Sequence, residues 1–457
     1  MPRQAGVLLP LFSVRSAADW GVGEIPDLVP WARWCAAAGF SAAQVLPVNE
    51  ASRGQNSPYA ALSAFAVDPV YVAVGALEVL EAFAKAEAAW LDDYALFVAI
   101  HDGEQGGRPW TEWPAPLRDR APAALAEARA RLSRLVLFHT WLQWQAEEQW
   151  HAARAAANAA GVELAGDLPF MVATDSADVW ARRGDFRLDA RVGVPPDAFS
   201  ATGQDWGLPV YRWDVMHADG LPWLSERGRR MADLYGLYRV DHVVGLYRTY
   251  FFPADGGVPA FVPAGEEAQR ENGERVLAAL SRGARVIAED LGTVPDFVRA
   301  SLTEKTIPGY RVLRWERHWD HPGQPFRDPE AWPSVSVATT GTHDTDSMAD
   351  WYDGMAAEER QAFLALPALA AVRERGATRF DEGVRDAILE LVYRSGSDLV
   401  LLPFQDAFGM RERVNVPGTV NDENWTYRIP RDLAALHGDR RERERLRALA
   451  VATGRTG

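Results

Sequence analysis

Short apolar runs recur along the chain, each ending in polar or acidic residues and each followed by a stretch long enough for a helix. Buried parallel strands are typically short runs of branched apolar residues, and strands that alternate with helices indicate βαβ units. Eight such runs predict an α/β fold, a (β/α)8 TIM barrel. The runs cover residues 7–11, 43–48, 162–167, 237–241, 285–290, 310–314, 335–340 and 399–406.

The second and third runs are more than a hundred residues apart, which is too far for one crossover helix. The Ala-rich sequence between them has apolar residues at helical spacing and predicts a helical insertion: Leu132, Leu135, Phe138 and Leu142, with Trp141, Trp144 and Trp150 nearby. We therefore expect a catalytic barrel from residues 1–75 and 160–430, a helical insertion subdomain from 76–159 and a C-terminal helix from 431–457.

Residues 182–214 are rich in Gly, Pro and Asp and lie between the third and fourth predicted strands. We expect a long loop here. Long loops in compact domains are often lids or binding loops. Phe199 and Trp206 could close apolar faces over a bound ligand, or could simply pack the loop.

Composition and charge exclude some classes of partner for this 457-residue chain. Asp and Glu outnumber Lys and Arg by 63 to 48, so there is no electrostatic footprint for nucleic acid or an anionic membrane. The single cysteine, Cys35, excludes an internal disulfide framework and a multi-cysteine metal site. With no signal peptide pattern at the start and no apolar run of about 18 residues, we expect a cytoplasmic protein.

The sequence lacks the motifs of several enzyme classes. The two lysines, Lys85 and Lys305, do not follow glycine, so there is no phosphate-binding loop of the GxxxxGK[ST] type. The sequence also contains no HExxH, GxSxG or CxxC, which disfavours metal hydrolases and serine hydrolases. Tryptophan is abundant, with 18 residues. These rings either pack the core or provide flat surfaces for sugar rings or bases.

Acidic residues close five of the eight apolar runs. In barrels of this kind the reactive groups lie at the carboxyl ends of the strands, where loops from different strands converge. A single acid at such a place is commonly a helix cap or an ion-pair partner, but five strands with the same ending suggest a ring of carboxylates. Such a ring fits a divalent-metal site or glycoside chemistry. The acids are Asp167, Asp241, Glu289, Asp290, Asp344 and Asp406.

Arg239 helps to choose between these chemistries. The two-residue period of a strand places Arg239 and Asp241 on one side, where the guanidinium keeps the carboxylate ionised, as a nucleophile requires. Glu289 has no basic neighbour in sequence, so a raised pKa suited to a general acid is expected. His242 and His343 each adjoin a candidate acid and could hydrogen-bond to sugar hydroxyls; metal ligation is the alternative for both.

At these acids the sequence resembles a known family. Residues 238–242 (YRVDH), 288–292 (AEDLG) and 341–344 (GTHD) are similar to three signature regions of the α-amylase clan. The particular residues that this chain carries in these three regions resemble those found in amylomaltases, the 4-α-glucanotransferases of glycoside hydrolase family 77. The resemblance extends from about residue 6 to about 430. It includes SPY at 57–59, SAFA at 63–66, GDLP at 166–169, DSADVW at 175–180, GVPPD at 193–197, TGQ at 202–204, WG at 206–207, YRW at 211–213 and NVPGT at 415–419.

The resemblance implies a role for each matching residue. Asp241 is expected to be the nucleophile, Glu289 the acid/base and Asp344 the third carboxylate, which holds sugar hydroxyls and stabilises the transition state. Arg239 is expected to orient Asp241. The donor sugar site is expected to be lined by Tyr59, Asp167 and His343.

The sequence departs from the family pattern at two places near the expected site. Ala198 precedes Phe199 in the loop after Pro-Pro-Asp, where many members carry an aromatic residue, which puts one lid contact in doubt. Thr345 follows Asp344 where Asn is common. Neither change removes a carboxylate.

The function implied is retaining transfer of 4-α-glucanosyl segments from one α-1,4-glucan to the 4-hydroxyl of another glucan or glucose, through a covalent glycosyl-aspartate. The expected partners are α-1,4-glucans and maltooligosaccharides, without nucleic acid or membrane, and no cofactor or metal is expected. An α-1,4-glucan hydrolase of the same clan shares the carboxylates and is the nearest alternative. A non-catalytic glucan-binding or regulatory barrel and a metal-dependent barrel enzyme are the others.

Overall fold

The structure is a computed structural model that describes residues 3–17, 19, 21–52, 54–55, 57–73, 80–196, 203–419 and 421–456. Eight parallel strands form a closed barrel in the order β1-β12-β11-β10-β9-β6-β3-β2. Each strand overlaps one of the eight predicted runs, so the predicted TIM barrel is confirmed. The strands are β1 (Gln4–Leu8), β2 (Ala42–Gln44), β3 (Glu163–Leu168), β6 (Leu237–Val240), β9 (Arg285–Ala288), β10 (Gly309–Val312), β11 (Ser336–Thr339) and β12 (Leu399–Pro403).

Small residues let the barrel close. A Cβ atom on Gly6 in β1 would lie 2.6 Å from Leu401 and 2.9 Å from Ala42, so only glycine fits between the neighbouring strands. Gly166 in β3 faces the ring of Tyr235 in the same way, at 2.3 Å. A separate apolar cluster contributed by seven of the eight strands is buried: Ala42, Ala165, Leu237, Ile287, Tyr310, Val312, Val337, Leu399 and Leu401.

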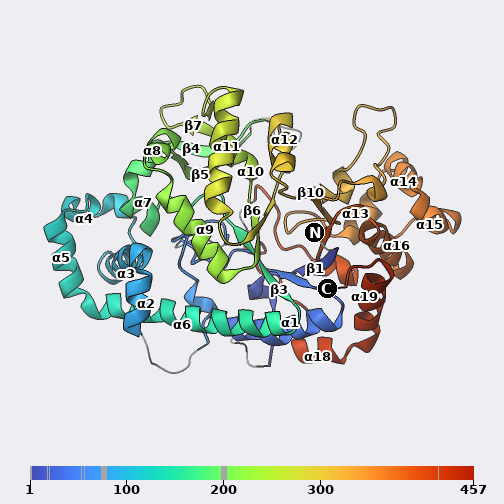
Figure 1. The fold of residues 1–457 in the computed structure, drawn as a ribbon, viewed down its shortest axis with the longest axis horizontal. Coiled ribbons are helices and arrows are strands. Elements are labelled where there is room, and N and C mark those ends of the chain that lie inside the picture. Colours follow the sequence, from blue (N-terminus) through green and yellow to red (C-terminus); the bar gives the residue numbers. More distant parts are fainter. Residues whose placement is uncertain are drawn as a thin grey trace.

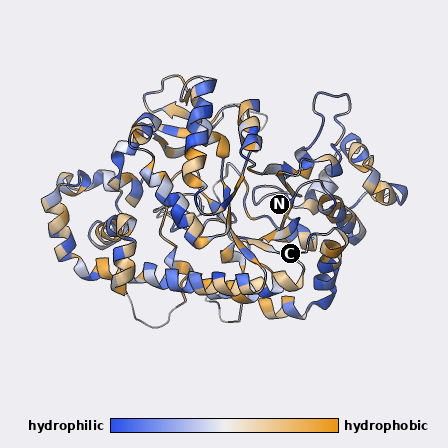
Figure 2. Cartoon of the chain, in the orientation of Figure 1, coloured by the Kyte–Doolittle hydropathy of each residue, from blue (hydrophilic) through white to orange (hydrophobic). Residues whose placement is uncertain are grey.

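Helices surround the strands (Figure 1). Many of them carry both hydrophilic and hydrophobic residues (Figure 2), as expected where one stripe packs on a barrel and the other meets water. Within the described residues, none of these helices is both long and apolar enough to cross a membrane. Those outside residues 80–159 and before residue 430 are α1 (Leu28–Ala37), α7 (Ala177–Ala181), α8 (Trp213–Ala218), α9 (Pro222–Leu234), α10 (Val243–Tyr247), α11 (Glu266–Leu280), α12 (Asp296–Glu304), α13 (Met348–Gly354), α14 (Ala357–Leu364), α15 (Ala370–Glu374), α16 (Glu382–Tyr393) and α17 (Phe404–Phe408).

Helices occupy the long interval between β2 and β3. They are α2 (Leu80–Ala86), α3 (Ala88–Gly103), α4 (Ala115–Arg118), α5 (Pro122–Arg131) and α6 (Ser133–Ala159). Helices α2 to α5 lie at one end of the long axis of the molecule, and α6 runs from them back toward the barrel (Figure 1). Of the apolar positions noted in the sequence, Trp144 and Trp150 are buried, whereas Leu135 and Phe138 are exposed.

The prediction of a long loop at residues 182–214 is wrong. This segment still leaves the barrel between its third and fourth strands, but it contains β4 (Phe186–Val194) and β5 (Gln204–Tyr211). They form an antiparallel sheet with β7 (Thr249–Pro253) and β8 (Ala260–Val262), in the order β5-β4-β7-β8. Strand β4 is stabilised by its pairing with β7, about 60 residues further on. The local abundance of Gly, Pro and Asp does not reveal such a distant partner, so the sequence pattern predicted a loop. Phe199 and Ala198 lie outside the described residues.

Two helices stand where one C-terminal helix was expected. They are α18 (Leu433–Gly438) and α19 (Arg440–Ala452). The side chain of Asp439 accepts a hydrogen bond from the backbone N–H of Glu442 and caps α19, so a new helix begins there. Short 3-10 helices connect other elements: Leu11–Ser13, Ile25–Asp27, Pro69–Tyr71, Trp110–Glu112, Arg183–Asp185, Leu313–Trp315, Pro329–Ala331 and Pro367–Leu369.

A buried histidine joins α3 to the segment that follows β3. The ring nitrogens of His101 lie 2.7 Å from an Asp102 oxygen and 3.2 Å from an Asp175 oxygen. The other Asp175 oxygen accepts a hydrogen bond from the backbone N–H of Trp110. Burial opposes charge on His101, but the hydrogen bonds to Asp102 and Asp175 prevail and raise its pKa to about 9.

This contact is expected to make stability depend on pH. A histidine whose pKa rises from 6.5 to about 9 on folding stabilises the protein fully below pH 6.5, and the contribution is lost as the pH rises through 9. We expect His101→Gln to lower the free energy of unfolding by about 1–3 kcal/mol at about pH 6 and by much less at about pH 9.5. Urea unfolding measures this, with exposed His321→Gln as the control. An equal loss at both pH values would contradict the assignment.

Candidate active site

The guanidinium of Arg239 joins the carboxyl ends of three neighbouring barrel strands. Strand β3 pairs with β6 so that Asp167 lies opposite Arg239. Nη1 of Arg239 donates to both oxygens of Asp167, at 2.7 and 2.8 Å. Nη2 lies 2.9 Å from Asp241 Oδ1 and 3.9 Å from Glu289 Oε2. One buried cation therefore contacts three of the acids predicted from the strand ends.

The position of Glu289 is fixed from both sides. It follows β9 directly, and its carboxylate accepts hydrogen bonds from the backbone N–H groups of His242, at 2.8 Å, and Leu291, at 3.2 Å. Burial raises the pKa of Glu289 to about 7; the positive charge of Arg239 opposes the rise and the negative charge of Asp241 adds to it. The raised pKa expected from the sequence is thus present, although the nearby base comes from another strand.

Asp241 is the more accessible of the two acids. Its side chain is 24% exposed, against 12% for Glu289. The next residue, His242, has a left-handed backbone with φ of 43°, which turns the chain sharply after β6 and begins α10. A carboxylate in contact with Arg239 and a neighbouring carboxyl group with a raised pKa can together support acid and nucleophile chemistry.

The Tyr59 hydroxyl donates to Asp167 Oδ2 at 2.7 Å, next to the bond that Arg239 makes to the same carboxylate. The Tyr59 ring stacks on His343, with centroids 5.4 Å apart and planes 20° apart. The structure therefore brings together Tyr59, Asp167 and His343, which were predicted to line the donor sugar site. Whether they bind sugar stays a prediction.

Asp344 completes the group from the loop after β11. Asn415 Nδ2 donates to its Oδ1 at 2.7 Å, and His343 Nε2 lies 3.4 Å from its Oδ2. Burial acts in the opposite direction, but His343 and the hydrogen bonds lower the pKa of Asp344 to about 2. The same contact raises the pKa of His343 against the effect of its burial. Asp344 is thus held ionised.

The hairpin of β4 and β5 reaches the site through Trp206. Its ring meets the ring of His242 edge to face, with centroids 4.9 Å apart. Burial lowers the pKa of His242 to about 4, so this imidazole is neutral at physiological pH. Trp206, predicted as a lid residue, therefore lies beside the residue that follows Asp241. The other predicted lid residue, Phe199, is outside the described part of the chain.

Sequence reasoning missed two residues of this group. Asn415 belongs to the NVPGT segment that carried the resemblance, but no role was assigned to it. Trp425 packs against the predicted donor site, with its ring centroid 6.0 Å from that of Tyr59 and 5.8 Å from that of His343. No local pattern marks Trp425, because a loop near the end of the barrel brings it there.

Two of the strand-end acids have other partners. Asp290 accepts a hydrogen bond from the backbone N–H of Tyr310 at 2.6 Å and lies within 3.7 Å of Arg299 and Arg311. Asp406 accepts hydrogen bonds from Thr340 and Met348. Among the described residues, no cluster of three or more His, Cys, Asp or Glu side chains has the arrangement of a metal site.

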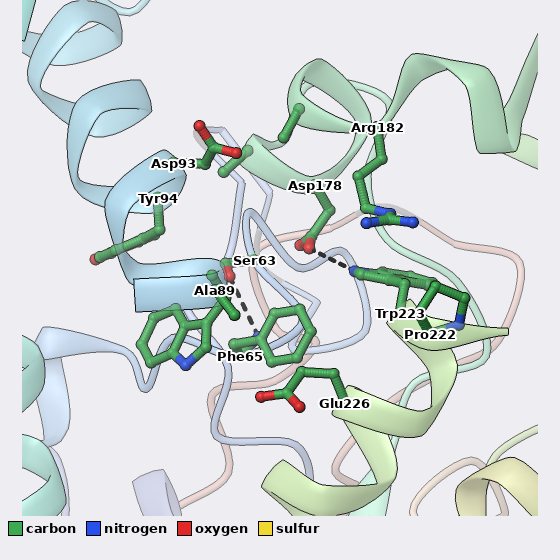
Figure 3. Close-up of a pocket in the computed structure, with 13 residues that line it drawn as sticks. Ser63, Phe65, Ala89, Asp93, Tyr94, Asp178, Arg182, Pro222, Trp223 and Glu226 are labelled. Carbon is green, nitrogen blue, oxygen red and sulfur yellow. Dashed lines mark hydrogen bonds between the residues drawn. The ribbon is translucent and has the colours of Figure 1, made fainter. Parts of the chain in front are cut away.

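A separate pocket of about 270 Å³ lies between α3, α7 and α9 (Figure 3). None of its 13 lining residues is a predicted site residue. Asp178, in this lining, accepts hydrogen bonds from the indole of Trp223 and from the backbone N–H of Ala64, in the segment that follows Tyr59. The carboxylates that contact Arg239 do not line this pocket, so we place the chemistry at the carboxylates and not here.

The family model of the 4-alpha-glucanotransferases, glycoside hydrolase family 77, matches residues 9–80 and 75–434. The chain belongs to the 4-alpha-glucanotransferase family. It is an enzyme of this type. A 4-alpha-glucanotransferase of Thermus thermophilus is 34% identical over 520 residues, covering 100% of this chain and 99% of the relative. One of Chlamydia pneumoniae is 29% identical over 500 residues, covering 94% and 92%.

Solved amylomaltase structures have the same fold as this member of the 4-alpha-glucanotransferase family. The amylomaltase of Streptococcus agalactiae in complex with acarbose superposes with a TM-score of 0.85 at 23% identity, covering 100% of both chains. The amylomaltase of Corynebacterium glutamicum gives a TM-score of 0.80 at 23% identity, covering 98% of this chain and 75% of the other. The family resemblance and the barrel fold predicted from the sequence are both confirmed.

In this family member, Arg239 is expected to be essential for stability. Removing one partner from a buried ion pair costs about 3–5 kcal/mol, because the remaining charges stay buried without compensation. We expect Arg239→Met to lower the free energy of unfolding by about this amount, as measured by urea unfolding at neutral pH.

Arg229 provides the matched control for Arg239. It also contacts three carboxylates, those of Glu87, Glu226 and Asp233, but its side chain is 40% exposed. Exposed ion pairs are each worth about 1 kcal/mol or less. Arg229→Met is therefore expected to cost much less than Arg239→Met. Equal losses for the two variants would show that the Arg239 contacts do not stabilise the site as described.

Proposed function

We propose that this enzyme transfers 4-α-glucanosyl segments from one α-1,4-glucan to the 4-hydroxyl of another glucan or of glucose, with retention of configuration. Donors and acceptors are α-1,4-glucans and maltooligosaccharides. The observation that carries the proposal is the arrangement at Arg239 Nη2. This single nitrogen contacts Asp241 at 2.9 Å and lies 3.9 Å from Glu289, whose pKa burial raises to about 7.

The first step forms a covalent ester. An Asp241 oxygen attacks the anomeric carbon of the donor, and the bond from that carbon to the leaving glucan oxygen breaks. The carboxyl proton of Glu289 passes to this oxygen, which leaves as a hydroxyl. The raised pKa of Glu289 supports this role, because an acid must hold its proton at neutral pH.

The second step reverses the roles. Glu289, now a carboxylate, takes the proton from the acceptor 4-hydroxyl, whose oxygen attacks the anomeric carbon, and the bond to Asp241 breaks. Two inversions at one carbon give net retention. The contact of both carboxylates with one nitrogen supports the close spacing of retaining enzymes, in which the two carboxyl groups lie about 5–5.5 Å apart.

The surrounding residues are proposed to hold the donor sugar. Asp344 is an ionised acceptor for sugar hydroxyls. Its negative charge stabilises the positive charge that develops on the sugar ring in the transition state. Tyr59 offers a ring fixed by Asp167 and His343, suited to stacking on a sugar face. The neutral ring of His242 can hydrogen-bond to hydroxyls without adding charge.

Transfer differs from hydrolysis in which acceptor reaches the glycosyl-enzyme first. Water is present at about 55 M, so a glucan hydroxyl wins only if the site excludes water and orients the acceptor; such orientation can be worth effective molarities of about 10⁵ M or more. The rim of the site carries Trp206, which supports water exclusion at the nucleophile.

We therefore expect maltotriose to be converted to glucose and a ladder of longer maltooligosaccharides, with almost no rise in total reducing ends. Chromatography and a reducing-end assay measure both quantities. Trp206→Ala is expected to raise the ratio of hydrolysis to transfer several-fold, because it opens the site to water. Trp141→Ala, at a partly buried tryptophan of α6, is the control.

A wild-type enzyme that raises reducing ends in step with substrate loss, and makes no product longer than maltotriose, is instead a hydrolase of the same clan. A protein that leaves maltotriose unchanged supports neither activity.

A further inference from the structure

Asp406 is a buried carboxylate at the end of β12, in the first turn of α17, and is 1% exposed. Its Oδ2 accepts a hydrogen bond from the hydroxyl of Thr340 at 2.5 Å. Its Oδ1 accepts one from the backbone N–H of Met348 at 2.7 Å. Thr340 is the first residue after β11, and Met348 is the first residue of α13. One side chain therefore bonds to both ends of the loop at 341–347.

That loop carries His343 and Asp344, the parts of the site that come from β11. Its interior is closed by Thr345, whose Oγ1 accepts from the backbone N–H of Thr342 and donates to the Thr342 carbonyl, both at 3.0 Å. A Cβ atom on Gly341 would lie 2.4 Å from Thr345 Oγ1, so the turn has no spare room. The Thr345 that departs from the family pattern thus has a local structural role.

Two arginines also hold the loop. Arg314 Nη2 donates to the carbonyl of Asp346 at 2.8 Å, and Arg413 Nη2 donates to the carbonyl of Asp344 at 2.9 Å. Both arginines act in the middle of the loop. Asp406 alone among these residues bonds to both ends of the loop, to Thr340 directly after β11 and to Met348 at the start of α13.

The ionisation of Asp406 matters for this geometry. Burial raises its pKa, while the Met348 N–H, Thr340 and the positive charge of Arg314 oppose the rise. The ionised carboxylate is acceptor-only, which matches two donors on opposite sides of the loop. An alanine removes both bonds, whereas an asparagine keeps the size of the side chain and offers one acceptor and one donor group.

We propose that Asp406 is a positioning residue, which fixes the 341–347 loop and thereby holds Asp344 and His343 in place against Arg239, Asp241 and Glu289. This inference rests on the proposed function, because it needs Asp344 to act on the sugar in the transition state. A displacement of about 1 Å at such a group can cost 10²-fold in rate.

The test measures fluoride release from α-glucosyl fluoride, a substrate that reports formation of the glycosyl-enzyme whichever acceptor follows. We expect Asp406→Ala to lower kcat roughly 10²-fold, with a smaller change in KM. Asp406→Asn is expected to recover at least about tenfold of this loss. Its amide oxygen can still accept from the Met348 N–H, and its NH2 group can donate to the Thr340 hydroxyl oxygen, which can act as an acceptor. Thr340→Val removes only one bond and is expected to lower kcat by less, which also covers the case that Asp406→Ala does not fold.

A double-mutant cycle separates positioning from a general defect. If Asp406 acts through Asp344, then in an Asp344→Asn background Asp406→Ala should lower kcat by less than about threefold further, since residues that act as a unit are not additive. Two independent defects would multiply. Asp27→Ala is the control: Asp27 is also buried and accepts a backbone N–H, that of Glu24 at 2.9 Å, and this variant should lose stability but keep kcat.

Each outcome decides a separate point. Unchanged kcat in folded Asp406→Ala, or full multiplicativity with Asp344→Asn, overturns the positioning role while leaving the proposed function intact. If Asp406→Ala does not fold, unchanged kcat in Thr340→Val overturns it. A wild-type enzyme that releases no fluoride and leaves maltotriose unchanged refutes the proposed function, and this inference with it.

Discussion

The site depends on the guanidinium of Arg239, which three carboxylates share. Burying carboxylates is costly unless each is paired and hydrogen-bonded, and here one cation contacts Asp167, Asp241 and Glu289 at the ends of three strands. The barrel makes this possible because parallel strands end at one face, and the register of β3 on β6 sets Asp167 opposite Arg239. The fold thus brings Asp167, Asp241 and Glu289, which are far apart in the sequence, within reach of one side chain.

One cation shared unequally gives two carboxylates with different properties. Arg239 contacts Asp241 at 2.9 Å, whereas Glu289 lies a further ångström away in a more buried position with a raised pKa. This asymmetry supports the separate roles that a double displacement needs, one ionised group and one that carries a proton. Tyr59, which bonds to Asp167 and to Arg239, connects this group to His343 and Asp344. The positions of His343 and Asp344 depend on the loop after β11, whose ends Asp406 holds.

The sequence predicted the barrel and the central acids, because buried parallel strands are short apolar runs and the acids follow them directly. It missed β4 and β5, whose pairing with β7 joins residues about 60 positions apart. It also could not separate Asp241 from Asp406 on strand position alone, since the direction of a side chain after a strand depends on the backbone that follows. Trp425 escaped prediction because only the folded loop brings it beside Tyr59.

The most direct test of the central claim is to trap the ester on Asp241. Glu289→Gln with α-glucosyl fluoride should form the glycosyl-enzyme, because fluoride leaves without a proton, and should break it down slowly, because no base activates the acceptor. Mass spectrometry is expected to show one added glucosyl unit per chain, mapped to the peptide that contains Asp241 and missing from the Asp241→Asn, Glu289→Gln double variant. Fluoride release without an adduct, or an adduct on another residue, would contradict the account.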